Sequence, residues 1–207
     1  MQNKKALVAN IILLVMEIVG LIAAIYFEKG FKLKYYTNWS NYLGLLSAIL
    51  FIINYYLEGK NSKFNNVCKI LKLTATLCLS LTFLVVLFMF VPYDHFNFLR
   101  WMIFRNYFSF HFFSPIICFI SFCFFEKYDF KYKYVIFEGF TFTIIYTIVI
   151  SILILAKKVE APYLFLDYYA YKWYTNVATI AIIGILTIGL LYLLTFLNKR
   201  DKTKDSE

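Results

Sequence analysis

Residues 34–46, KYYTNWSNYLGLL, set the architecture of this chain, because they combine a polar helix start with the apolarity of a helix interior. Small and polar residues recur here at spacings of three and four, which place them on one helix face: Thr37, Ser40, Asn41, Gly44 and Ser47. Such residues collect where membrane helices pack, since they allow close approach and inter-helix hydrogen bonds. The stretch therefore predicts a helix whose polar stripe faces the interior of a bundle.

The composition places this helix in a membrane protein. Of the 207 residues, 62% are hydrophobic and only 16% are charged, which is outside the range of soluble domains. Six windows reach the length of about 20 helical residues that spans the hydrocarbon: 6–27, 37–57, 70–91, 107–125, 134–155 and 175–197. We predict an all-α polytopic protein, with one six-helix transmembrane domain over residues 1–198 and a charged tail over 199–207.

The positive charges indicate the orientation of this domain. Outside the six windows, 13 of the 21 lysines and arginines lie on the side of the two termini and 8 on the other side, with Lys72 counted in the second loop. Positive residues favour the cytoplasmic face, so both termini are predicted to be cytoplasmic. The three tryptophans mark the opposite, outer face as the aromatic one.

Charge and cysteine content exclude several classes of function. A net charge of +9 would suggest nucleic-acid binding in a soluble protein, but here the cations follow the loops, so we expect no nucleic-acid partner. The four cysteines lie in or next to the windows without a C-x-x-C pair, and the chain has two histidines. We therefore predict neither a metal nor a cofactor.

Three polar residues mark the outer end of the predicted bundle. The second, fourth and sixth windows run in the same direction, so Thr37, His111 and Asp167 come to a similar depth on one face. His111 and Ser114 share a polar helix face with Pro115, which would kink the helix beside them. A hydroxyl, an imidazole and a carboxylate are the groups that acyl transfer uses.

Each of these residues also has a structural explanation. Thr37 would act as an N-cap by accepting a hydrogen bond from an amide of the first turn. His111 would hydrogen-bond between helices, and Asp167 would cap a helix or close a loop, which is the favoured interpretation for this residue. From residue types alone, the structural and the chemical explanations both stay open for Thr37 and His111.

Glu17 is a separate candidate, because it lies near the middle of the first window, roughly 15 Å from either end. A carboxyl group at that depth is protonated or paired inside the bundle, and Asn10 on the same helix face would assist it. We expect a neutral, packed Glu17. The alternative is a small proton- or solute-coupled transporter or channel that uses Glu17 and His111.

Three segments, YYTNWSNYLGLL, HFFSP and PYLFLDYY, resemble in this order the androgen-induced and androgen-dependent family of six-span membrane hydrolases and its bacterial branch. The resemblance implies six spans, cytoplasmic termini and hydrolysis of fatty-acid esters of hydroxy fatty acids. It also implies a catalytic pair formed by a threonine at the head of the second span and a histidine at the head of the fourth. These positions are Thr37 and His111 in this chain.

The sequence therefore predicts an intramembrane threonine hydrolase or acyl transferase that acts on a lipid or fatty-acid ester. His111 would take the proton of Thr37, whose oxygen would attack the ester carbonyl. Four residues are expected to support the pair or bind substrate: Ser40, Asn41, Ser114 and Asp167. Ser40 or Asn41 would donate a hydrogen bond to the oxyanion. Asp167 would orient His111 or bind a polar head group. The expected partners are membrane lipid and a lipid-like ester, and the expected location is a bacterial plasma membrane, with the site facing outward.

Overall fold

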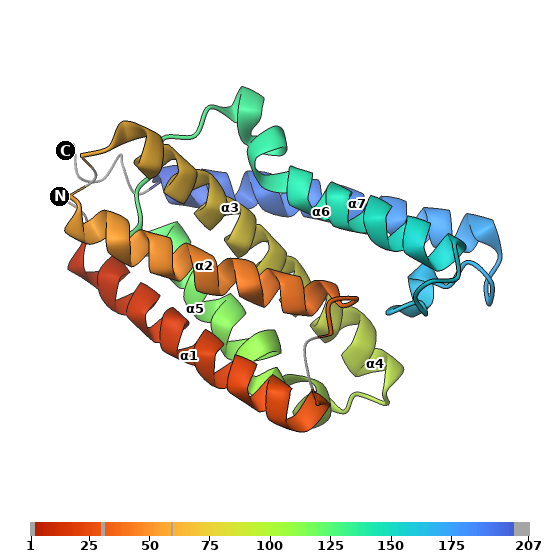
Figure 1. The fold of residues 1–207 in the computed structure, drawn as a ribbon. Helices are drawn as coiled ribbons and strands as arrows, with labels where there is room; N and C mark the ends of the chain where they lie inside the picture. The colour runs from red at the N-terminus through yellow and green to blue at the C-terminus, as the bar shows by residue number, and fades with distance from the viewer. Residues whose placement is uncertain (1–2, 30–31, 59, 201–207) are drawn as a thin grey trace.

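The computed structural model describes residues 3–29, 32–58 and 60–200, and within them the chain folds into helices without a strand (Figure 1). The α-helices are α1 (Lys4–Glu28), α2 (Tyr36–Tyr56), α3 (Ser62–Val85), α4 (Val91–Tyr93), α5 (Ser114–Ile120), α6 (Tyr132–Leu155) and α7 (Trp173–Arg200). The prediction of an all-α protein is confirmed. Lys199 and Arg200 belong to α7, and the rest of the predicted tail lies outside the described residues.

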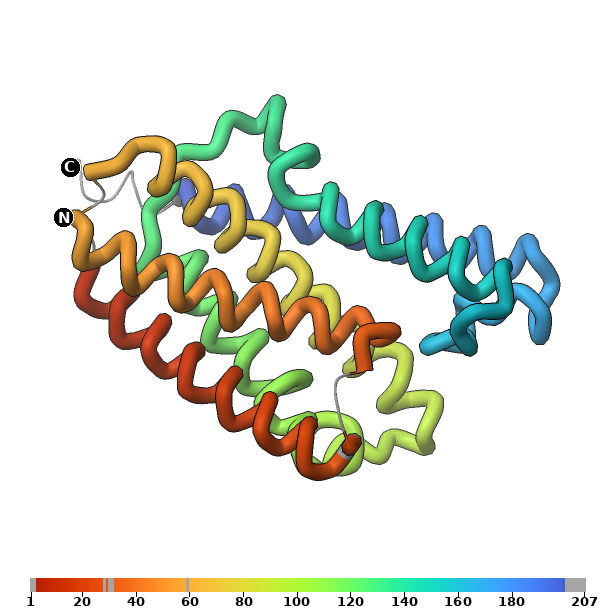
Figure 2. The backbone as a smooth tube through the Cα atoms, viewed as in Figure 1, coloured from red at the N-terminus to blue at the C-terminus, as the bar shows by residue number. Residues whose placement is uncertain are grey.

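Helix α3 lies at the centre of the arrangement, where it packs against α2, α5 and α6 (Figures 1 and 2). Helices α1 and α2 run side by side, and α6 and α7 form a second pair that extends beyond the others. In the apolar 18-residue stretch of the segment around α3, 61% of the residues are buried, against 22% for the same length in α6 and in α7. Helix α1 begins and α7 ends at the same end of the bundle, and positions along the bundle are given relative to that end.

Five described segments are long and apolar enough to cross a membrane: Lys4–Phe27, Ser62–Tyr93, Phe108–Phe125, Tyr132–Leu155 and Trp173–Lys199. This apolar helical arrangement is that of an integral membrane protein. Helix α2 is not one of the five. Its polar stripe is buried inside the bundle, as the helical spacing predicts: Ser40, Asn41, Gly44, Ser47 and Ala48.

Wide π-helical turns interrupt two of these segments, each beside a proline. After α3 the turn Val86–Phe90 precedes Pro92, and before α5 the turn Phe108–Phe113 precedes Pro115. Proline has no amide hydrogen to continue the helical pattern, and the preceding amide of Ser114 bonds to the carbonyl five residues back, on Ser109. The kink predicted at Pro115 therefore takes the form of a widened turn.

A buried ion pair joins three elements at the end where α1 begins. Lys72 Nζ lies 3.2 Å from Glu126 Oε1, and both side chains are 1% exposed. The same ammonium donates to Asn10 Oδ1 at 2.6 Å. Glu126 also accepts hydrogen bonds from Asn10, Ser121 and Tyr128, at 2.9, 2.6 and 2.8 Å. A buried pair of charges is stable only with such additional hydrogen bonds, so this network holds α1, α3 and the segment after α5 together.

Two interpretations of the sequence are wrong at this network. Lys72 was assigned to a loop because it is charged, but it lies within α3 and is fully buried. Asn10 was expected to assist Glu17, but its amide bonds to the Lys72–Glu126 pair instead. The acidic partner of Lys72 lies 54 positions further along the chain, and no local pattern indicates it.

Removing one charge of this pair is expected to destabilise the protein strongly. Lys72→Met leaves Glu126 as a buried, unpaired charge, which costs about 3–5 kcal/mol of unfolding free energy. Thermal and denaturant unfolding in detergent micelles measures the loss. The control is Lys69→Met, because Lys69 pairs at 4.0 Å with Glu138 and both side chains are partly exposed; a pair of this kind is worth about 0–1 kcal/mol. Equal losses in the two variants would contradict the assigned role of the network.

Candidate functional site

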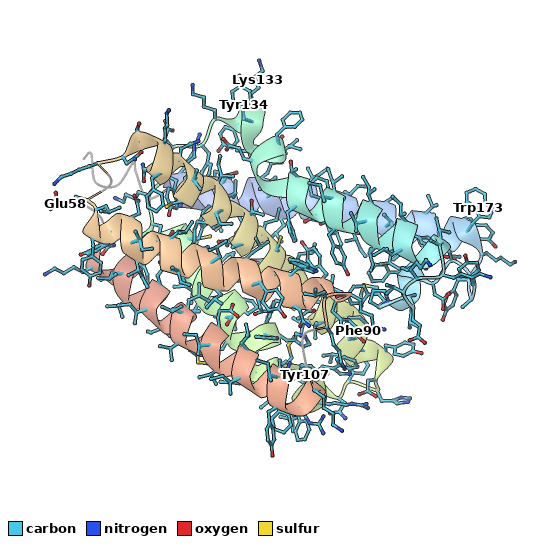
Figure 3. The ribbon with its side chains drawn as sticks, viewed as in Figure 1. Glu58, Phe90, Tyr107, Lys133, Tyr134 and Trp173 are labelled. Atoms are coloured by element: carbon cyan, nitrogen blue, oxygen red, sulfur yellow. The ribbon has the colours of Figure 1, made fainter. Side chains whose placement is uncertain are left out.

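Thr37 and His111 line one cavity of about 430 Å³. The cavity lies where α1 ends and α2 begins, so it is at the end of the bundle opposite the buried ion pair. Figure 3 labels two more of its lining residues, Phe90 and Tyr107, which lie at the end of the bundle far from Glu58. Two residues that are 74 positions apart in sequence thus face the same space.

Irregular backbone builds most of this cavity. The π-helical turns Val86–Phe90, Leu99–Ile103 and Phe108–Phe113 each contribute lining residues, among them Phe90, Trp101 and His111. Widened turns are frequent at functional sites, because they free backbone carbonyl groups and redirect side chains. The remaining wall comes from the end of α1, the start of α2, residues 105–107 and the loops before α2 and before α7.

The histidine of the cavity is held in one orientation. His111 Nδ1 lies 2.7 Å from the carbonyl oxygen of Trp101, and the ring stacks on Tyr107 with 4.7 Å between ring centres. A carbonyl oxygen only accepts hydrogen bonds, so in neutral His111 the hydrogen is on Nδ1 and Nε2 keeps its lone pair. This is the tautomer that a general base needs.

Asp167 does not take the orienting position that the sequence suggested. Its carboxylate accepts hydrogen bonds from the amides of Tyr169 and Ala170, at 3.1 and 3.0 Å, within its own loop. It does not line the cavity of His111. The orienting group is the backbone carbonyl of Trp101, which no residue-type pattern reveals.

Thr37 is the second residue of α2, and its hydroxyl does not cap the helix. The N-cap residue, Tyr35, makes no capping bond with its side chain. Instead, the hydroxyl of Tyr163 accepts hydrogen bonds from the amides of Tyr36 and Thr37, at 2.8 and 3.4 Å. Tyr163 therefore fills the capping role considered for Thr37.

Tyr163 is a site residue that the sequence did not single out. Burial raises its pKa to about 12, although hydrogen bonds from Thr37, including one from the threonine side chain, lower it. The phenol therefore keeps its proton at neutral pH. A protonated hydroxyl beside Thr37 is a donor for negative charge that develops on a substrate oxygen.

Ser40 and Asn41 lie behind Thr37 and do not line the cavity. Ser40 hydrogen-bonds to the carbonyl of Thr37 at 2.8 Å and to the hydroxyl of Thr82 at 3.0 Å. The Asn41 amide donates to the carbonyls of Thr37 and Phe110, at 2.7 and 3.4 Å. Both residues thus fix the start of α2 against α3 and against the turn that carries His111. They position Thr37, and the oxyanion role expected of them is not supported by this geometry.

Glu17 and Ser114 form a separate buried group inside the bundle. Both residues are 0% exposed, and the Glu17 carboxyl interacts with Ser114 without a hydrogen bond of good geometry. Glu17 Oε1 also lies close to Gly44, where an added Cβ would be 2.7 Å from it. Neither residue lines the cavity of His111. The structure therefore does not bring Glu17 and His111 into one cavity.

A second cavity, of about 220 Å³ and mainly apolar, lies between α2, α3, α6 and α7. Four residues line both cavities: Thr37, Val86, Phe90 and Tyr163. Thr37 thus stands at the boundary between an apolar cavity and the cavity that contains His111. A lipid with an apolar chain on one side of a reactive bond and a polar group on the other would fit this arrangement.

Comparison of the chain with protein-family models, with curated proteins and with solved structures finds no match. Among the described residues, no group of three or more His, Cys, Asp and Glu side chains is placed to hold a metal ion.

The tautomer of His111 is directly measurable. We expect 15N NMR of histidine-labelled protein at neutral pH to show the hydrogen of His111 on Nδ1, because the Trp101 carbonyl can only accept. The chain has one other histidine, His95, so a His95→Gln variant assigns the signals. A hydrogen found on Nε2 in neutral His111 would rule out the orientation described above.

Proposed function

We propose that this protein is an intramembrane hydrolase or acyl transferase that acts on a lipid ester, with Thr37 as nucleophile and His111 as general base. The observation that carries the proposal is the cavity that both residues line, with His111 Nδ1 bound to the Trp101 carbonyl. The resemblance to the androgen-induced and androgen-dependent hydrolases supports the same pair. The chemistry needs no metal or cofactor, since hydroxyl, imidazole and phenol groups supply the proton transfers.

The reaction follows from the positions of these groups. Nε2 of His111 takes the hydroxyl proton as Thr37 Oγ1 attacks the ester carbonyl, and Tyr163 donates to the resulting oxyanion. His111 then gives the proton to the departing alkoxide, which leaves an acyl-threonine. Water, or a second alcohol, attacks this intermediate with the same proton transfers and restores Thr37. In this mechanism Ser40 and Asn41 hold the threonine backbone in place.

We further propose that α2 is a sixth span, so that both termini are cytoplasmic and the site faces outward in a bacterial plasma membrane. Two observations support this orientation. Helix α1 begins and α7 ends at the same end of the bundle, as an even number of spans requires. That end also has the larger share of lysine and arginine outside the predicted spans, 12 against 8 once the buried Lys72 is left out.

The rival function, a proton- or solute-coupled transporter, would use Glu17 and His111 along one path. It has less support, because Glu17 is packed against Gly44 and Ser114, away from the cavity of His111. Because Glu17 does not line the cavity of His111, the two residues do not share the single path that a relay between them would need. The two functions differ in the residue that activity requires, which is Thr37 for the hydrolase and Glu17 for the transporter.

Covalent labelling separates these functions. We expect a lipid-like fluorophosphonate to label the wild type and Thr37→Ser, and Thr37→Ala to abolish labelling. His111→Ala should slow it by about 10²–10⁴, the usual contribution of a general base, and Glu17→Gln should leave it within a few-fold of wild type. Gel fluorescence over time gives the rates.

The matched control for this experiment is Thr141→Ala, because Thr141 is an exposed helical threonine bonded only to its own helix backbone. Equal labelling of Thr37→Ala and Thr141→Ala would exclude Thr37 as the nucleophile. Labelling that is lost in Glu17→Gln alone would favour the transporter.

Tyr163→Phe tests the proposed oxyanion donor. Loss of one such donor typically slows the reaction by about 10²–10³, and we expect labelling to slow by this amount. The control is Tyr168→Phe. Tyr168 lies in the same loop, but its phenol hydrogen-bonds to Ser151 and not to the start of α2. Unfolding temperatures of both variants identify any loss of fold. A labelling rate of Tyr163→Phe equal to that of Tyr168→Phe would remove Tyr163 from the mechanism.

A further inference from the structure

Three cations surround the cavity of Thr37 and His111. Lys29 follows α1, Lys32 precedes α2 and Arg105 follows the turn Leu99–Ile103, and all three line the cavity. None of its described lining residues is an aspartate or a glutamate. Within the described parts of the chain, the three cations also take part in no ion pair. The cavity therefore carries a concentrated positive charge that no acidic side chain among its described lining residues neutralises.

A hydrogen bond fixes the backbone at Lys32, and ring contacts hold the Arg105 side chain. The carbonyl of Lys32 accepts from the Asn38 side chain at 2.9 Å, which ties the loop to α2 one residue after Thr37. The guanidinium of Arg105 lies 5.3 Å from the ring centre of Phe27 and 5.1 Å from that of Phe104. Such contacts limit the freedom of a long side chain and so lower the entropy cost of binding an anion.

The position of Thr37 relates this charge to the reaction. On one side of the threonine lies the cationic cavity, and on the other lies the apolar cavity between α2, α3, α6 and α7. In a glycerophospholipid, an acyl ester separates an apolar chain from a phosphate diester by only a few bonds. A phospholipid therefore places its ester carbonyl at Thr37 when its chain and its phosphate occupy the two cavities.

We propose that the substrate is an anionic phospholipid, whose phosphate binds Lys29, Lys32 and Arg105 while its acyl chain enters the apolar cavity. This inference rests on the proposed function for its reaction, but the headgroup site stands on the charges alone. Lysine and arginine are the common partners of phosphate groups. A zwitterionic headgroup fits less well, because its ammonium group would meet three cations and no carboxylate.

Competition against fluorophosphonate labelling tests the headgroup site. The competitors are dihexanoyl phosphatidylglycerol, dihexanoyl phosphatidylcholine and inorganic phosphate. We expect phosphatidylglycerol to protect Thr37 at a concentration at least about tenfold lower than phosphatidylcholine, which corresponds to about 1.4 kcal/mol. Inorganic phosphate should not protect at the same concentration, since it lacks the acyl chain. Protection by phosphate equal to that by phosphatidylglycerol would mean that the site takes free phosphate and not a lipid.

The charge variant is Lys29→Gln/Lys32→Gln/Arg105→Gln, which should reduce the preference for phosphatidylglycerol to about twofold or less. Its control removes three charges from the loop between α6 and α7, outside the cavity: Lys157→Gln/Lys158→Gln/Lys172→Gln. This control should keep the preference. Arg105→Gln alone replaces the triple variant if that protein does not fold. An equal preference in the cavity variant and the control would overturn the proposal.

Binding measured without chemistry separates this inference from the proposed function. Native mass spectrometry of Thr37→Ala with the same two lipids should retain the preference for phosphatidylglycerol, because the cations are intact. Equal binding of the two lipids would overturn the headgroup site, even if labelling depends on Thr37. Selective binding together with labelling that does not need Thr37 would leave the headgroup site in place and refute the hydrolase.

Discussion

The buried ion pair between Lys72 and Glu126 is the interaction on which the arrangement of the other helices depends. It joins α3 to the end of the α5 segment, and Asn10 adds α1 to the same network. The Asn198 amide of α7 donates to the carbonyl of Glu126 at 2.9 Å, so a fourth element is fixed there. Two charges inside an apolar bundle tolerate few other arrangements, since each alternative leaves one of them unpaired. The ion pair therefore fixes the direction of α5. His111 lies in the turn before α5 and so comes to the opposite end of the bundle.

The two ends of the bundle differ in how their backbone is built. Near the ion pair, side-chain hydrogen bonds tie the helices together, and the one widened turn there, Ser121–Phe125, is bonded to Glu126 through Ser121. Around the cavity, Pro92 and Pro115 follow widened turns, and carbonyl groups become available for other partners. In a third widened turn, Leu99–Ile103, the carbonyl of Trp101 fixes the histidine tautomer without a buried charge.

The sequence predicts the helical membrane fold well, because apolar windows and the polar stripe around Thr37 follow directly from helical geometry. It also indicates Thr37 and His111, since helices that run in the same direction bring their starts to one end of a bundle. It fails for Lys72, because a charge in an apolar window resembles a loop residue until its partner is known. It fails as well for the cap from Tyr163 and the carbonyl of Trp101, which depend on contacts between distant segments. Asp167 accepts hydrogen bonds from amides of its own loop, which is the interpretation that the sequence favours for this residue.

Thr37 and His111 line one cavity, and the proposed reaction requires that their side chains approach each other there, which cross-linking measures. The four native cysteines would be replaced by alanine, and Thr37→Cys/His111→Cys treated in membranes with a short bifunctional thiol reagent. The negative control is Thr37→Cys/Ser62→Cys, because Ser62 begins α3 at the opposite end of the bundle. We expect a rapid intramolecular cross-link in the first pair and none in the second. Reaction of both cysteines without a cross-link between positions 37 and 111 would contradict it.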